Sequence, residues 1–365
     1  MKPATMKVVV FGATGVVGRA AAEQFALQSG CEVVAVSRRE LDVPGVVHVP
    51  VDLADADASA AAARSPEFEG TTHVVFAALQ ESPELAAGWR DAALIEHNAM
   101  LFRNALEPLA SACASTLEHV SLLQGAKAYG FHLGRTAVPG KERTPRDAHA
   151  NFYFEQEDRL RALAAGAPWS WTVFRPQVVY GESYGSPMNL LPAIGVYAAL
   201  EREAGRALSF PGHPDGVSEA VDARLLARAL AWAAEASTAR GEIFNVTNGD
   251  VFSWCDVWPS IAAVFAMDVG EPAPTRLADV MPPRASEWAA MVERHALAAP
   301  ADMEAFVGGS WAYADILFGA AGRAPTVPAL LSTVKIRQAG FHDCVDTEDM
   351  LCEWLREFQR RNLLP

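Results

Sequence analysis

The stretch Lys7-Val-Val-Val-Phe-Gly12-Ala-Thr-Gly15-Val-Val-Gly18 decides the fold of this 365-residue chain. An apolar run leads into three glycines spaced three residues apart, and a helical pattern follows. A dinucleotide pyrophosphate needs a tight turn, close backbone approach and free N–H groups at a helix start, all of which this context supplies. The motif therefore predicts a nucleotide site formed by Gly12, Thr14, Gly15, Val16 and Gly18. The alternative is a tight strand-to-helix turn that binds nothing.

Outward from this motif, short apolar runs alternate with helical patterns. The runs predict strands at 7–11, 32–37, 46–50, 73–77, 119–123 and 170–180. The patterns between them predict helices at 16–28, 56–64, 89–115 and 151–165. Continuous apolar runs are typical of strands buried on both faces, so we expect an α/β Rossmann fold with a doubly wound parallel sheet.

Beyond residue 180 the pattern changes. Further helices are predicted at 188–203, 222–234 and 346–359, and a strand at 242–246. Residues 254–318 are rich in Trp, Met, Pro and Phe without strand alternation, which favours a mostly helical substrate cap over the carboxyl end of the sheet. We expect a dinucleotide-binding domain over 1–180 and a substrate-binding region over 181–365, with a segment at about 215–250 returning to the first domain.

Composition excludes several classes of protein. The net charge of −14 and the lack of basic runs argue against nucleic-acid or membrane-surface partners. No apolar stretch is long enough to span a bilayer, and residues 1–7 lead straight into a strand without a signal-peptide pattern. The five cysteines and nine histidines show no metal-ligand spacing. We expect a cytoplasmic monomer or homodimer with reduced thiols and no metal.

The end of the second strand predicts the choice of cofactor. It reads Ser37-Arg38-Arg39, where domains that prefer NAD place an acidic residue for the ribose 2′-hydroxyl. Two guanidinium groups favour a 2′-phosphate and hence NADPH, although a solvated basic loop is the alternative. Residues after other strands are further candidates for cofactor contact, with core packing as the alternative: Asp52, Leu53, Ala77, Ala78, Leu79, Val178 and Val179.

The usual catalytic pattern of short-chain dehydrogenases is missing. A Tyr-x-x-x-Lys turn places an ammonium beside a phenol and lowers its pKa, but Tyr153 is followed four residues later by Glu157. A carboxylate in that place is expected to oppose formation of a phenolate. Lys127 offers a replacement, because it follows the fifth strand at the sheet edge where a nicotinamide ring would lie.

Two segments around these residues resemble a known family. Leu123-Gln-Gly-Ala-Lys-Ala-Tyr-Gly-Phe131 and Asn151-Phe-Tyr-Phe-Glu-Gln-Glu-Asp158 are similar to the signatures of the progesterone 5β-reductase/iridoid synthase family, a divergent branch of the extended short-chain dehydrogenases. The similarity covers most of the chain and is loosest over 254–328. It includes the arginine pair and the segments 97–104, 174–181, 188–190 and 239–252. The first signature departs from the family at 123–125, 128 and 131–133.

The resemblance implies roles for the two residues. Tyr153 would stabilise an enolate oxygen, and Lys127 would supply positive potential and hold the tyrosine and the ribose, so that both residues are also candidates for cofactor binding. NADPH would deliver hydride to the β-carbon of an α,β-unsaturated carbonyl compound. The substrate would be a small, apolar, carbonyl-bearing molecule. Candidate pocket residues, for which core packing is the alternative, are Phe131, Met188, Asn189, Trp311 and Tyr313.

Two other functions stay open at this point. One is a regulator that binds NADP(H) without turnover, which the missing Tyr-x-x-x-Lys turn favours. The other is a different activity of the extended short-chain dehydrogenases, either sugar-nucleotide epimerisation or 1,2-reduction of a carbonyl. Arg38 and Glu157 both disfavour an epimerase, because epimerases use NAD and the ordinary Tyr/Lys helix.

Overall fold

A computed structural model describes residues 6–82, 85–134, 137–320 and 328–365. The chain divides into two compact units, each considered by itself. Unit 1 contains Met1–Gln177, Ala223–Thr247 and Leu331–Asp343. Unit 2 contains Val178–Asp222, Asn248–Leu330 and Cys344–Pro365.

Unit 1 is built on a seven-stranded sheet with the order β10-β6-β5-β4-β1-β2-β3, in which all neighbouring strands run parallel. Its strands are β1 Met6–Phe11, β2 Cys31–Ser37, β3 Val46–Pro50, β4 His73–Phe76, β5 His119–Leu123, β6 Ser170–Pro176 and β10 Glu242–Val246. The strand order reverses at β1, between β4 and β2, which is where doubly wound sheets bind ligands. The predicted Rossmann fold is confirmed.

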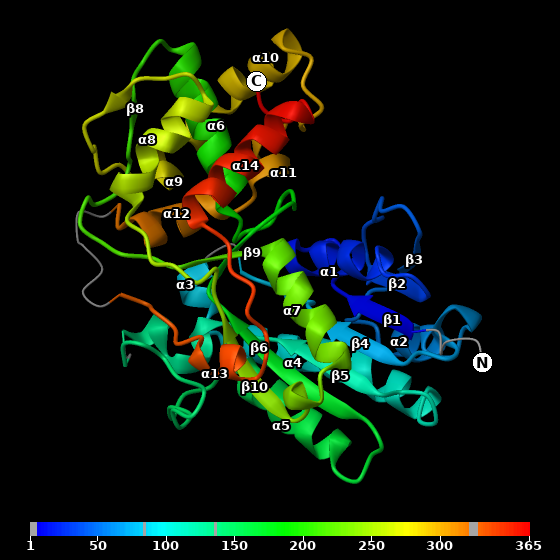
Figure 1. Ribbon diagram of the computed structural model, residues 1–365. Coiled ribbons are helices and arrows are strands. Elements are labelled where there is room, and N and C mark those ends of the chain that lie inside the picture. The colour runs from blue at the N-terminus through cyan, green and yellow to red at the C-terminus, as the bar shows by residue number, and fades with distance from the viewer. Residues whose placement is uncertain (1–5, 83–84, 135–136, 321–327) are drawn as a thin grey trace. The chain divides into compact units, whose positions relative to one another are not determined.

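Helices cover both faces of this sheet. Those of unit 1 are α1 Val16–Ala26, α2 Ala56–Ala62, α3 Leu85–Gly88, α4 Ala92–Ala112, α5 Phe152–Ala164, α7 Ala223–Glu235 and α13 Val334–Gln338. Figure 1 shows α1 and α7 over one face of the sheet, with α4 and α5 over the other. Successive residues of β1 therefore point to opposite covered faces, and Val8, Val9 and Val10 are each 0% exposed.

One predicted strand is two in the structure. The run 170–180 forms β6, which ends at Pro176, and β7 Val178–Tyr180, which pairs with β9 Ala220–Asp222 in a separate sheet. Proline has no N–H to extend a ladder, and the N–H of Gln177 bonds to Val246 at the end of β10. The prediction was wrong because an apolar run does not by itself reveal where a strand leaves its sheet.

Unit 2 is mostly helical, as the composition predicts for the C-terminal region. Besides β7 and β9 it contains α6 Leu190–Glu203, β8 Leu208–Ser209, α8 Trp254–Val264, β11 Val269–Gly270, α9 Leu277–Val280, α10 Ala285–Arg294, α11 Met303–Val307, α12 Ser310–Phe318 and α14 Thr347–Arg360. Aromatic rings fill its core: Trp254 and Trp258 pack around Phe210 and Phe318. Tryptophan and phenylalanine thus provide the apolar area that holds these short helices together.

Two kinds of feature are absent from the described residues. No helix there has the length and apolar character needed to cross a bilayer. The same ranges hold no group of three or more His, Cys, Asp or Glu side chains arranged to bind a metal ion.

Candidate active site

The glycine motif forms the turn between β1 and α1. Gly12 has a φ of +80°, and a Cβ there would lie 2.6 Å from the Cα of Ala78, which follows β4. A Cβ at Gly18 would collide with the carbonyl oxygen of Gly12. The N-cap residue of α1 is Gly15, which has no side chain to bond to the N–H groups of the first helical turn. These N–H groups can therefore bond to a ligand. This cradle of backbone fits an anionic pyrophosphate, with Thr14 and Val16 on either side of Gly15.

The arginine pair follows β2, next to this turn. Gly12 and Ala13 both bond through their N–H groups to the carbonyl oxygen of Val36 in β2. Ser37 is buried and donates from its hydroxyl to the carbonyl oxygen of Arg39 at 2.7 Å, which shapes the turn. Arg38 and Arg39 are exposed. Both guanidinium groups therefore lie at the surface, where solvent and an anion can reach the strand end.

The other candidates for cofactor contact in unit 1 lie at the same sheet edge. Asp52 is exposed, and its carboxylate accepts a bond from the N–H of Ala54 at 3.0 Å. Leu53 is buried in the core between sheet and helices. The segment 77–79, which contains Ala77, Ala78 and Leu79, leaves β4 beside the glycine turn, and Leu79 is 39% exposed. Their contacts with a nucleotide stay predictions.

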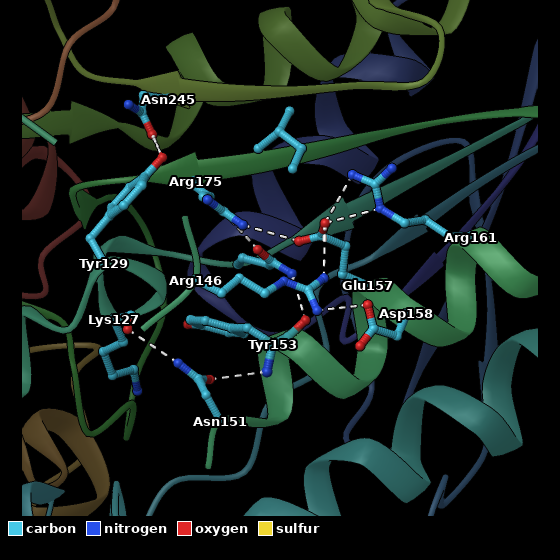
Figure 2. A network of polar contacts seen from close by, with 12 residues as sticks. Lys127, Tyr129, Arg146, Asn151, Tyr153, Glu157, Asp158, Arg161, Arg175 and Asn245 are labelled. Atoms are coloured by element: carbon cyan, nitrogen blue, oxygen red, sulfur yellow. Dashed lines mark hydrogen bonds and ion pairs between the residues drawn. The ribbon is translucent and has the colours of Figure 1, made fainter. Parts of the chain in front are cut away.

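Tyr153 is fixed at the start of α5 by two amide side chains. Asn151 caps the helix by accepting from the N–H of Tyr153 at 3.0 Å, and it donates to the carbonyl oxygen of Lys127 at 3.1 Å (Figure 2). Gln124 donates to the carbonyl oxygen of Tyr153 at 2.8 Å. Asn151 and Gln124 were not assigned roles from the sequence, although both stand inside the two signature segments. They connect the helix start to the end of β5.

The Tyr153 hydroxyl and the Lys127 amine lie at the carboxyl edge of the sheet. A Cβ placed on Gly125 would lie 3.3 Å from the Tyr153 hydroxyl and 3.6 Å from the carbonyl oxygen of Pro176, so the hydroxyl lies against the ends of β5 and β6. Lys127 follows β5 in a 3₁₀ turn, Ala126–Tyr129, and its Nζ lies 5.9 Å from the centre of the Tyr153 ring. The two groups are thus brought together across 26 positions of chain.

Lys127 has a carboxylate partner that the sequence reading missed. Its Nζ lies 2.8 Å from Oε1 of Glu81, in the loop after β4. Burial lowers the pKa of Lys127, and the Glu81 charge and hydrogen bond act in the opposite direction. The sequence signal was weak, since Glu81 belongs to no motif and stands 46 positions from the lysine.

Glu157 does not act on the phenol as expected. Its carboxylate lies 3.0 Å from nitrogens of Arg146, Arg161 and Arg175 (Figure 2). Although burial would raise the pKa of Glu157, the positive charges of Arg175 and Arg146 and the arginine hydrogen bonds hold it below its ordinary value. The expectation that Glu157 opposes formation of a phenolate at Tyr153 was wrong, because three guanidinium groups balance the charge of this carboxylate.

Two other tyrosines, Tyr129 in unit 1 and Tyr180 in unit 2, are poor candidates for proton transfer. Tyr129 donates from its hydroxyl to Oδ1 of Asn245 at 2.6 Å, and the Arg175 guanidinium lies 5.1 Å from the centre of its ring. Burial raises the pKa of Tyr129. Tyr180 is 1% exposed, and burial raises its pKa well above the usual value. Neither is suited to losing a proton.

The remaining pocket candidates differ in exposure. Phe131 is half-buried beside Tyr129, with their ring centres 6.2 Å apart. In unit 2, Val178 and Val179 form most of β7 and are half-buried, as are Met188 and Tyr313, while Trp311 is 3% exposed. Their cofactor or substrate contacts stay predictions.

Asn189 has a structural task. It is 0% exposed and caps α6 by accepting from the N–H of Leu191. Its amide donates to the carbonyl oxygens of Gly181 and Ser183 at 2.9 and 3.0 Å. These bonds account for both ends of its side chain.

A parallel seven-stranded sheet with a glycine turn after β1, followed by a helical C-terminal region, defines an extended short-chain dehydrogenase type of Rossmann protein. More narrowly, the chain belongs to the PRISE-like Rossmann-fold domain family, whose model matches residues 39–316. This confirms the resemblance to the progesterone 5β-reductase/iridoid synthase family.

Individual relatives and structures agree with this assignment. The chain is 28% identical to an (S)-8-oxocitronellyl enol synthase of Nepeta cataria, over 98% of this chain and 91% of the relative. It is also 28% identical to a 3-oxo-Δ(4,5)-steroid 5β-reductase of Arabidopsis thaliana, over 98% and 92%. The structure of a Thermus thermophilus UDP-glucose 4-epimerase in complex with NAD superposes with a TM-score of 0.64 at 21% identity, over 97% of this chain and 99% of that chain. The fold and the relatives support an oxidoreductase, and the Rossmann fold indicates a nicotinamide cofactor.

Proposed function

We propose that the protein is an NADPH-dependent reductase that adds hydride to the carbon–carbon double bond of α,β-unsaturated carbonyl compounds. The observation that carries the proposal is the Lys127 amine 5.9 Å from the Tyr153 ring at the carboxyl edge of the sheet. The names of the two plant relatives support it, since one is a steroid 5β-reductase. The exposed pair Arg38 and Arg39 supports NADPH over NADH.

The residues divide the chemistry between them. When bound, NADPH supplies the hydride that adds to the β-carbon of the substrate. The π electrons move toward the carbonyl oxygen, and Tyr153 donates a hydrogen bond or its proton to the resulting enolate oxygen. The positive charge of Lys127 stabilises negative charge that develops on the phenol and on the enolate oxygen. A proton from water at the α-carbon then gives the saturated carbonyl compound, and a proton that Tyr153 gave to the oxygen returns to the phenolate.

The test is NADPH oxidation with a panel of small enones and enals, such as cyclohexenone, followed by identification of the products. We expect saturated ketones and aldehydes. Allylic alcohols as the main products would replace the proposal with 1,2-reduction. Saturable NADPH binding without oxidation across the panel would favour a regulator that binds the cofactor without turnover.

A further inference from the structure

Glu81 is a buried carboxylate whose two oxygens each have a partner. Its side chain is 3% exposed. Oε1 accepts from Nζ of Lys127 at 2.8 Å, and Oε2 accepts from the indole N–H of Trp89 at 2.9 Å. Because the indole bond fixes the plane of the carboxylate, the oxygen that meets the lysine is held in one position.

Lys127 otherwise faces mainly aromatic surface. Its Nζ lies 4.8 Å from the centre of the Trp89 ring and 5.9 Å from that of Phe152, the same distance as from Tyr153. Ring faces attract a cation only modestly. They do not replace the water that a buried ammonium has lost.

Among the residues that the structure describes, the other ionisable groups near Lys127 do not compensate its charge. His132, in the 3₁₀ turn Phe131–Leu133, lies beside the lysine, and His149 and Arg90 lie next to His132. Burial lowers the pKa of His132 to about 4, with His149, Lys127 and Arg90 acting in the same direction. His132 is therefore neutral at pH 7, and its ring carries no charge that could compensate the ammonium.

These contacts assign a role to Glu81. We infer that Glu81 is a positioning residue that holds the Lys127 side chain next to Tyr153 and keeps its amine protonated, with Trp89 orienting the carboxylate. A buried lysine without a counter-charge can titrate several units below its ordinary pKa. The effect on turnover rests on the proposed function, whereas the charge of Lys127 can be measured without turnover.

The chain suits a direct measurement of this charge, because it has five lysines: Lys2, Lys7, Lys127, Lys141 and Lys335. Trace acetylation with acetic anhydride across a pH series, read by mass spectrometry of each lysine peptide, gives the pH midpoint of each amine. We expect Glu81→Gln to lower the Lys127 midpoint by about 1–3 units. Lys335, which pairs with Glu242, is the internal reference and keeps its midpoint.

Two further variants control for folding and for general loss of charge. Glu96→Gln removes an exposed carboxylate that pairs with Arg103, and it should leave the Lys127 midpoint unchanged. Trp89→Phe keeps the charge of Glu81 and an aromatic ring beside the amine while it removes the indole hydrogen bond, so we expect a smaller shift in the same direction. If Glu81→Gln fails to fold, the Trp89 variant still decides, and an unchanged midpoint in the folded variant overturns the inference.

The pH profile of kcat separates this inference from the proposed function. In Glu81→Gln the alkaline limb should move to lower pH by the same amount as the acetylation midpoint, while Glu96→Gln follows the wild type. A purely structural role would lower kcat at all pH values without moving the limb, which would contradict the inference. A shifted midpoint in a protein that never oxidises NADPH would support the role of Glu81 in the charge of Lys127 and refute the proposed function.

Discussion

The glycine turn lies at the same edge of one sheet as the side chains around Tyr153, here called the Tyr153 cluster: Glu81, Gln124, Lys127, Tyr153, Glu157 and Arg175. The two sites are built in opposite ways. The turn uses backbone atoms from one continuous segment, 12–18, and its glycines are needed because a Cβ at Gly12 or Gly18 would meet the chain. The cluster uses side chains from the loops after β4 and β5, from α5 and from β6. A site made of backbone atoms from one segment can therefore be recognised as a sequence motif. A site made of side chains depends on which distant segments the fold brings together.

The difference also concerns charge. At the turn, α1 begins without a side-chain cap and the arginine pair is exposed at the neighbouring strand end, so the positive end of the helix and two guanidinium groups can meet an anion. In the cluster, the buried charges already have partners within the protein: Lys127 with Glu81, and Arg175 with Glu157. We therefore expect mutations in the cluster to affect stability or turnover and mutations at the turn to affect nucleotide binding.

The largest effect is expected from Glu157→Gln. Arg175 and Glu157 side chains are each 4% exposed, so removing the carboxylate leaves a buried guanidinium without its counter-charge. Breaking such a pair costs about 3–5 kcal/mol of unfolding free energy, which urea unfolding can measure. Asp158→Asn is the matched control, because Asp158 is exposed and pairs with Arg146; its cost should stay within about 1 kcal/mol. Equal losses of unfolding free energy in the two variants would show that the ion pairs of Glu157 do not stabilise the Tyr153 cluster.

Tyr153→Phe comes next and tests turnover alone. Removing a donor to an oxyanion lowers kcat by about 10²–10³. The Kd for NADPH, measured by fluorescence titration, should stay within about twofold of wild type, since an oxyanion donor acts mainly on the transition state. Tyr129→Phe is the control, because its hydroxyl is bonded to Asn245. An active Tyr153→Phe protein would show that another group stabilises the enolate.

Arg38→Asp tests nucleotide binding at the glycine turn and the neighbouring end of β2. We expect the KM for NADPH to rise by about tenfold or more, because a charge-assisted bond to a phosphate contributes about 1.5–3 kcal/mol. The KM for NADH should change little. Arg64→Asp, at the exposed end of α2, makes the same change of net charge away from the strand end. Equal losses with both cofactors would mean that Arg38 contacts no 2′-phosphate.

The smallest effect at neutral pH is expected at the opposite end of β5. Burial lowers the pKa of His119 to about 3, from an ordinary value of 6.5. The unfolded chain therefore takes up a proton first, and the stabilisation present above pH 6.5 is lost as the pH falls toward 3. The slope is about 1.4 kcal/mol per pH unit. Urea unfolding should show this slope reduced in His119→Gln, with kcat unaffected at neutral pH; an unchanged slope would contradict the assignment.

Much of the fold and part of the site could be predicted from sequence. The apolar runs predict six of the seven sheet strands well because strands buried on both faces need apolar side chains at every position. The run 170–180 was misread because the exit of the chain after Pro176 depends on pairing with β9. Lys127 and Tyr153 were singled out by their places after the fifth strand and at the start of a helix, and a family resemblance gave them their roles. Glu81 was missed because its partner lies 46 positions away and no local pattern requires it.

The sequence by itself determined the parallel sheet and the nucleotide turn, because both follow from local rules: apolar runs, glycine spacing and the start of a helix. Only the tertiary structure decided which charges meet. It placed Glu81 against Lys127 and turned Glu157 toward three arginines, although spacing alone set Glu157 against the Tyr153 phenol. The reason is physical: buried charges must be compensated within the protein, and the compensating groups come from whichever strands the fold makes neighbours.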